Sequence, residues 1–175
     1  MSRPASSSAA LPIAHIVLRI LIVVNWLCGV AIVALLVVMP HEQWIMAAFK
    51  IPPSSDAARL MMGLRAIAVA GLAAVPLNYA LLKRLLAIVD TVRAGDPFLA
   101  VNASRLQAIA WALLALQILS VVIGAIANAV STPAHPLHLD AGFSINGWLA
   151  VLLTFLLARV FAEGTRMRDD LEGTV

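Results

Sequence analysis

Long runs of apolar residues follow one another along this chain, separated by short polar segments. Four runs have the roughly 20 apolar residues that a helix needs to cross the hydrocarbon core of a bilayer. They lie at about 16–39, 60–82, 106–130 and 143–162. Because the connecting segments are short, neighbouring helices should run antiparallel. The pattern predicts one all-α domain over residues 1–175, an integral membrane four-helix bundle.

The composition supports a membrane protein. Hydrophobic residues make up 62% of the chain, charged residues only 12%, and the mean hydropathy is +0.98. A soluble domain carries roughly 25% charged residues. The apolar run from Ile16 to Met39 is longer than the core of a signal peptide, and no small-residue cleavage site follows it, so we expect a retained anchor. The single cysteine, Cys28, can form no internal disulfide.

The basic residues predict the orientation of the spans. Lys50, Arg59 and Arg65 fall on one side of the predicted membrane, and the other nine of the twelve Lys and Arg residues fall on the opposite side. Because cytoplasmic segments carry the excess of Lys and Arg, both termini and the connection between the second and third helices should be cytoplasmic. Topology alone explains the net charge of +3, so we expect no direct binding of nucleic acid.

The second predicted helix is longer than a bilayer is thick. Asp56 suits its N-cap, and Gly95 suits its C-terminal end with Arg93 in the last turn. The 38 residues between Asp56 and Gly95 would form a helix about 57 Å long, whereas the hydrocarbon core is about 30 Å thick. The third helix should restart at once, with Asp96 as its cap and Pro97 in the first helical position.

Helical spacing continues beyond the spans in the third and fourth helices. We expect the extended parts of the second, third and fourth helices to pack together as a small helical bundle in the cytoplasm. The stripe in the third helix is Leu99, Asn102, Leu106, Ile109 and Leu113, and the heptad-like seam in the fourth is Leu157, Val160, Gly164, Met167 and Leu171.

Several motifs resemble one bacterial family, the domain of unknown function numbered twenty-nine seventy-five. The resemblance covers roughly the second span onward, and the first span matches only in general character. The motifs are Arg93-Ala-Gly-Asp-Pro-Phe98 with Asn102 and Arg105-Leu106, Phe143-Ser-Ile-Asn-Gly-Trp-Leu149, Phe161-Ala-Glu-Gly-Thr165, and Asp169-Asp-Leu-Glu-Gly-Thr-Val175.

The resemblance implies a four-helix protein of the bacterial cytoplasmic (inner) membrane, without an established activity and without catalytic residues. Such proteins are often encoded beside a small helix-turn-helix DNA-binding protein. This implies a cytoplasmic regulator as a partner.

One loop carries a weak candidate for a metal site. His135, His138 and Asp140 could ligate zinc or copper, but Pro133 and Pro136 break any helix that would align them. A structural site normally needs four ligands, so residues of the other outer loop would have to contribute. We favour an ordinary polar loop and expect no metal or cofactor.

Polar residues within the spans are a second group of candidates. Asn25, Arg65, Asn78 and Gln117 are expensive to place in lipid, so each invites a functional hypothesis. The favoured interpretation is hydrogen bonding between helices; the alternative is a path for a ligand or ion. Arg65 lies close enough to the outer surface to extend its charge into the interface.

No catalytic motif is present: the chain has no His-Glu-x-x-His, Gly-x-Ser-x-Gly or phosphate-binding loop. We therefore expect a non-enzymatic anchor or sensor, embedded in the lipid bilayer, that binds a cytoplasmic partner. The expected docking residues are Arg93, Asp96, Phe98, Asn102 and Arg105. The alternative is a small transporter or channel component, acting as a homo-oligomer with Asn25, Asn78 and Gln117 around a polar path.

Overall fold

The computed structural model describes residues 10–38, 55–96, 98–131 and 141–172. The described chain is all helical, with α1 at Ala10–Val38, α3 at Ser55–Arg93, α4 at Ala100–Val130 and α5 at Ile145–Glu172. Each of these four helices is long and apolar enough to cross a membrane. The predicted all-α class and the four candidate spans are thus confirmed, and they indicate a multi-pass membrane protein.

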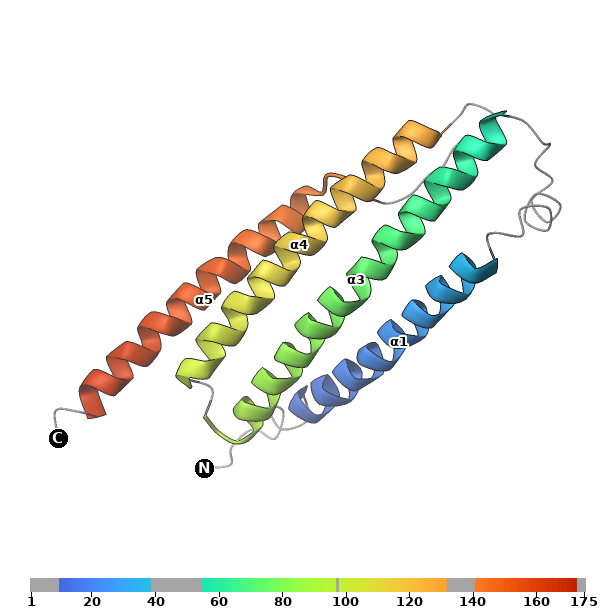
Figure 1. Ribbon diagram of the computed structural model, residues 1–175. Coiled ribbons are helices and arrows are strands. Elements are labelled where there is room, and N and C mark those ends of the chain that lie inside the picture. Colours follow the sequence, from blue (N-terminus) through green and yellow to red (C-terminus); the bar gives the residue numbers. More distant parts are fainter. Residues whose placement is uncertain (1–9, 39–54, 97, 132–140, 173–175) are drawn as a thin grey trace.

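Consecutive helices run antiparallel (Figure 1). The start of α1, the corner between α3 and α4 at residues 94–99, and the end of α5 lie at the same end of the molecule. We call this the corner end. The start of α3, the end of α4 and the start of α5 lie toward the opposite end. This places the first and last described helical residues on one side, as the sequence predicts.

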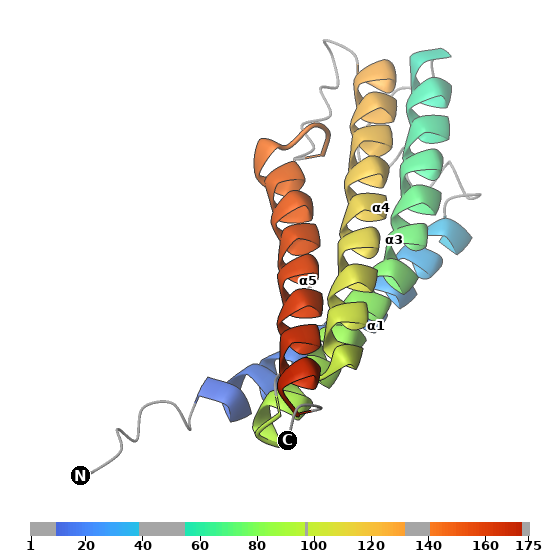
Figure 2. The same ribbon diagram turned by 90° about the vertical axis from the view of Figure 1, so that its left-hand side faces the viewer.

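The helices form an open row in chain order, which differs from the four-helix bundle that the sequence predicts. In the part of the chain that the structure describes, α1 packs on α3, α3 on α4 and α4 on α5, and no other pair of helices is in contact. Figure 2 shows α1 tilted across the direction shared by α3, α4 and α5. The reason is that apolar helix faces need no protein cover in lipid, so closing the row is not required.

Glycines mark the close approaches between neighbouring helices. A Cβ added to Gly29 of α1 would lie 3.1 Å from Cγ1 of Val75 in α3, and one added to Gly63 of α3 would lie 2.5 Å from Cγ1 of Val130 in α4. Gly147 of α5 occupies the same kind of position against α4. Small residues allow helix backbones to approach closely in membranes, and each of the three contacts uses one.

The two packing patterns predicted for the third and fourth helices have different outcomes. In α4, Asn102, Leu106 and Ile109 are buried, as the predicted stripe requires. In α5 the predicted seam is wrong, because its large members are exposed: Leu157 at 45%, Val160 at 58% and Met167 at 56%. The face that packs is instead formed by residues seven apart: Val151, Ala158 and Thr165.

The starts of α3 and α4 also differ from the predicted ones. α3 spans 39 residues, about 58 Å, so its length beyond a 30 Å core is confirmed. It begins at Ser55, so Asp56 is not its N-cap. α4 begins at Ala100 after an extended Leu99 that makes no side-chain cap, so the predicted start with Asp96 as cap is wrong, and Pro97 lies outside the described residues.

Candidate functional site at the α3–α4 corner

A glycine closes α3 and turns the chain. Gly95 has a φ of +90°, in the left-handed region that favours glycine. The amide of Gly95 donates to the carbonyl of Val92 (3.1 Å) and the amide of Asp96 to that of Thr91 (3.1 Å). This pair of bonds is the Schellman motif. The predicted role of Gly95 is therefore confirmed.

After the turn, the chain stays extended long enough for Phe98 to meet α5. Its ring stacks on that of Phe161, with ring centroids 5.5 Å apart. The stack lies just before α4, which starts at Ala100 after an extended Leu99. Phe161 lies within the predicted fourth span, so the stack shows α5 meeting the hairpin there, and the packing of the extended end of α5 stays a prediction.

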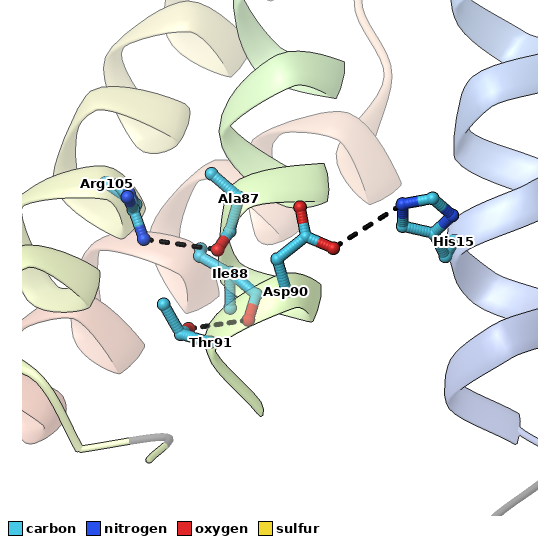
Figure 3. A network of polar contacts seen from close by, with 6 residues as sticks. All are labelled: His15, Ala87, Ile88, Asp90, Thr91 and Arg105. Atoms are coloured by element: carbon cyan, nitrogen blue, oxygen red, sulfur yellow. Dashed lines mark hydrogen bonds and ion pairs between the residues drawn. The ribbon is translucent and has the colours of Figure 1, made fainter. Parts of the chain in front are cut away.

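Beneath the corner, a polar network joins α3 to α4. The side-chain amide of Asn102 donates to Oγ1 of Thr91 (2.7 Å), whose hydroxyl donates to the carbonyl of Ile88 (2.7 Å). Nη1 of Arg105 donates to Oδ1 of Asn102 (2.9 Å) and to the carbonyl of Ala87 (3.1 Å). Figure 3 shows the bonds from Arg105 to Ala87 and from Thr91 to Ile88.

Asn102 is the centre of this network and is 0% exposed. A buried amide is tolerated only when its donors and acceptors are satisfied, and here both sides of the amide are bonded. The network therefore fixes the two helices around the corner. It also changes the role of Asn102, which the sequence places among the docking residues: a fully buried side chain cannot touch a partner.

The outer surface of the corner is formed by other residues. Arg93, the basic residue in the last turn of α3, is exposed. Phe98 keeps 49% of its surface exposed despite the stack on Phe161. Asp96 and Arg105 are half-buried. Of the five predicted docking residues, Arg93 and Phe98 thus offer the most accessible surface.

A further contact ties α1 to the corner end. Nε2 of His15 in α1 lies 3.5 Å from Oδ1 of Asp90 in α3 (Figure 3). Sequence reasoning missed His15, Asp90 and Thr91. A signal for Thr91 was present, because in an antiparallel hairpin residues equally far from the turn face each other. Thr91 and Asn102 lie at nearly equal distances on either side of the corner.

The predicted intramembrane polar residues do not converge. Asn25 donates its side-chain amide to the carbonyl of Val75 (3.1 Å) and so links α1 to α3. Gln117 is 9% exposed and lies against Gly147, between α4 and α5. Arg65 and Asn78 are half-buried in α3. Asn25 and Gln117 thus lie in different helix–helix contacts, and of the two Asn25 makes an interhelical hydrogen bond.

Two buried side-chain donors, one in α4 and one in α5, make no hydrogen bond. They are Nε2 of Gln117 and Nε1 of Trp148, neither of which is hydrogen-bonded in the structure. The candidate metal ligands His135, His138 and Asp140 lie outside the described residues. Among the described residues, no group of three His, Cys, Asp or Glu side chains could hold a metal ion.

Comparison with known proteins identifies a family and no closer relative. No curated protein and no solved structure matches the chain. The model of the family described as "Protein of unknown function (DUF2975)" matches residues 12–175. The match includes α1, which the sequence resemblance covered only in general character. Because it spans nearly the whole chain, this four-helix protein belongs to the DUF2975 family of proteins of unknown function.

Proposed function

We propose that this protein is a non-enzymatic anchor or sensor of the inner membrane that binds a cytoplasmic partner at the α3–α4 corner. The observation that carries the proposal is the construction of the corner. A buried polar network and a Schellman turn fix its backbone, while Arg93 and Phe98 remain exposed on it. A fixed surface of this kind lowers the ordering cost of binding.

The orientation rests on the distribution of cations. Lys83, Arg84, Arg93 and Arg105 lie in the half of the α3–α4 hairpin nearest the corner, whereas Arg59 and Arg65 lie in the half of α3 nearest the opposite end. The positive-inside rule then places the corner end, and with it both termini, in the cytoplasm. The parts of α3, α4 and α5 that exceed the bilayer thickness extend on that side.

The partner is proposed on family resemblance alone: a small helix-turn-helix regulator encoded beside this gene. An exposed arginine and an exposed phenylalanine on the same corner suit an acidic surface with an apolar centre, because Arg and aromatic residues carry most of the binding energy in protein interfaces.

Copurification in detergent tests the proposal. The tagged wild-type protein should recover the adjacent regulator, and Arg93→Glu and Phe98→Ala should each reduce the recovered amount at least tenfold. Met62→Ala is the matched control, since Met62 is 74% exposed and lies toward the opposite end. Equal recovery by the wild type and both corner variants would show that the corner is not the docking surface.

The alternative, a transporter or channel component, is less well supported. It needs Asn25, Asn78 and Gln117 around one path, whereas Asn25 and Gln117 lie in separate contacts of an open row. A homo-oligomer would have to bring these residues together between chains. Flux assays in vesicles with the wild type and Gln117→Ala would test this alternative directly.

A further inference from the structure

A basic cavity lies along the corner-end half of α3, apart from the surface at Arg93 and Phe98. Its volume is about 440 Å³, and its lining residues are Tyr79, Ala80, Lys83, Arg84, Ala87 and Arg105. Three of the six are cations and none is acidic. Arg105 comes from α4, so the cavity spans the α3–α4 contact. An arrangement of three like charges around one space is unfavourable unless an anion occupies it.

The three cations have no carboxylate partner among the described residues. Nη1 of Arg84 donates to the carbonyl of Ala80 (3.0 Å), and Nη1 of Arg105 donates to neutral oxygens of Ala87 and Asn102. Nζ of Lys83 lies 5.8 Å from the centre of the Tyr79 ring. The nearby Asp90 instead lies against His15. The described part of the chain therefore positions these cations without neutralising them.

The cavity lies at the depth of a membrane interface. Arg59, near the start of α3, donates to the carbonyl of Ala129 at the end of α4 and marks the opposite end. About 20 residues of helix cross a 30 Å core, which places Tyr79 and Lys83 at the other boundary of that core. The centroids of the Tyr79 and Trp26 rings lie 5.6 Å apart at this depth. Trp and Tyr residues are enriched at membrane interfaces.

A second cavity shows that the charge is particular to this site. It lies between α4 and α5, measures about 480 Å³, and is lined by Ala103, Ser104, Gln107, Phe155, Ala158, Arg159 and Ala162. Two cavities of similar size on neighbouring helix contacts thus carry three cations and one cation, respectively. The three cations of the basic cavity are therefore not a consequence of cavity size.

We propose that the cavity lined by Lys83, Arg84 and Arg105 binds the phosphate of an anionic phospholipid. A phosphate diester accepts hydrogen bonds from guanidinium and ammonium groups and neutralises their charge. Within the described residues, Arg105 donates only through Nη1, so its Nε and Nη2 donors can reach a phosphate. Basic pockets between transmembrane helices are a known form of site for anionic headgroups.

A lipid fits this site better than a soluble phosphate compound because of what surrounds it. Large apolar side chains of α1 continue from this depth toward the opposite end with their surfaces exposed, including Trp26 at 53% and Leu27 at 63%. Acyl chains would cover such surfaces while the headgroup phosphate fills the cavity. A free phosphate ion would gain nothing from them.

The test measures lipid binding to the purified full-length protein by native mass spectrometry. Phosphatidylglycerol should bind in preference to phosphatidylethanolamine, which has the same phosphate but no net charge. Lys83→Gln combined with Arg84→Gln should lower the affinity for phosphatidylglycerol roughly 30-fold, since each interfacial cation contributes about a fivefold gain. Arg105 is kept, because it also bonds Asn102.

The matched control is Arg159→Gln, which removes the cation of the second cavity and should leave the affinity unchanged. Circular dichroism and the elution volume of each variant show whether it is folded.

Equal binding of phosphatidylglycerol by the wild type and the folded double variant would overturn the proposal. Equal binding of the two lipids by the wild type would overturn it as well. Millimolar inorganic phosphate that displaces the lipid completely would show that the site prefers the free ion. The assay contains no partner protein, so its outcome is independent of docking at the corner.

Discussion

The first and third helices of the row, α1 and α4, differ sharply in how they are packed. α4 lies between α3 and α5 and buries nine residues, whereas α1 contacts only α3 and buries Gly29 alone. Yet α1 contains the more apolar span of the two. In a soluble protein the more apolar helix would be the more buried one. Here apolarity places a helix in lipid, and a few small or polar residues determine its neighbours.

The contacts that hold α1 illustrate this division. They include a hydrogen bond from Asn25 to the carbonyl of Val75, the close approach of Gly29 to the Val75 side chain, the tilted contact of the Trp26 and Tyr79 rings, and the contact of His15 with Asp90. The large aliphatic residues of α1 remain mostly exposed. Substitutions in the α3–α4 and α4–α5 contacts should therefore lower the stability of the protein more than equivalent substitutions in α1.

The largest effect is expected for Asn102→Ala at the centre of the polar network. The change removes the acceptor of Arg105 and the donor to Thr91 and leaves a cavity, so unfolding should require about 2–3 kcal/mol less free energy. Denaturation in mixed detergent micelles, followed by circular dichroism, measures the difference. Asn128→Ala is the control, because Asn128 is exposed near the end of the same helix. Equal losses for both variants would mean that the network does not hold the hairpin.

A smaller loss is expected for Gly147→Val in the contact between α4 and α5. A Cβ at this position would overlap the side-chain amide of Gln117, and overpacking should cost about 1–2 kcal/mol after the better helix propensity of valine is included. Gly164→Val is the matched control in α5, because a Cβ there meets no atom within 4 Å. Adding Gln117→Ala to Gly147→Val should recover part of the stability, and no recovery in this double mutant would contradict the clash.

The smallest effect is expected in α1, for Asn25→Ala. Hydrogen bonds between transmembrane helices contribute about 0.6 kcal/mol on average, so the loss should be of that order. Cys28→Ala, on the exposed surface of the same helix, should change stability by less. A loss for Asn25→Ala as large as that for Asn102→Ala would remove the distinction between the edge and the centre of the row.

The sequence predicted the features that depend on hydrophobicity and on local backbone chemistry. Apolar runs located four helices, the end of α4 at Val130 was placed correctly, and Gly95 was recognised as the residue that closes α3. The start of α4 was predicted wrongly, because Asp96 and Pro97 are typical helix-start residues but the helix begins at Ala100. The stack of Phe98 on Phe161 is a tertiary contact, and no local signal reports it.

Packing faces were harder to predict, for a physical reason. The large residues Leu157, Val160 and Met167 look like a seam, but in lipid they gain as much from acyl chains as from another helix. The buried face of α5 is marked by the smaller Ala158 and Thr165. Likewise, the cations of the basic cavity come from two helices, and only the fold shows that Arg105 lies beside Lys83 and Arg84.

The open row has a consequence for the order of assembly during synthesis. Because each described helix contacts only the helices next to it in the chain, α3 can pack on α1 before α4 is made, and α4 on α3 before α5 is made. Because the described helices pack only on their neighbours in the chain, the contacts between them have low contact order and cost little loop-closure entropy. A nascent chain released into the bilayer one helix at a time can therefore acquire its final neighbours in the sequence in which the ribosome delivers them.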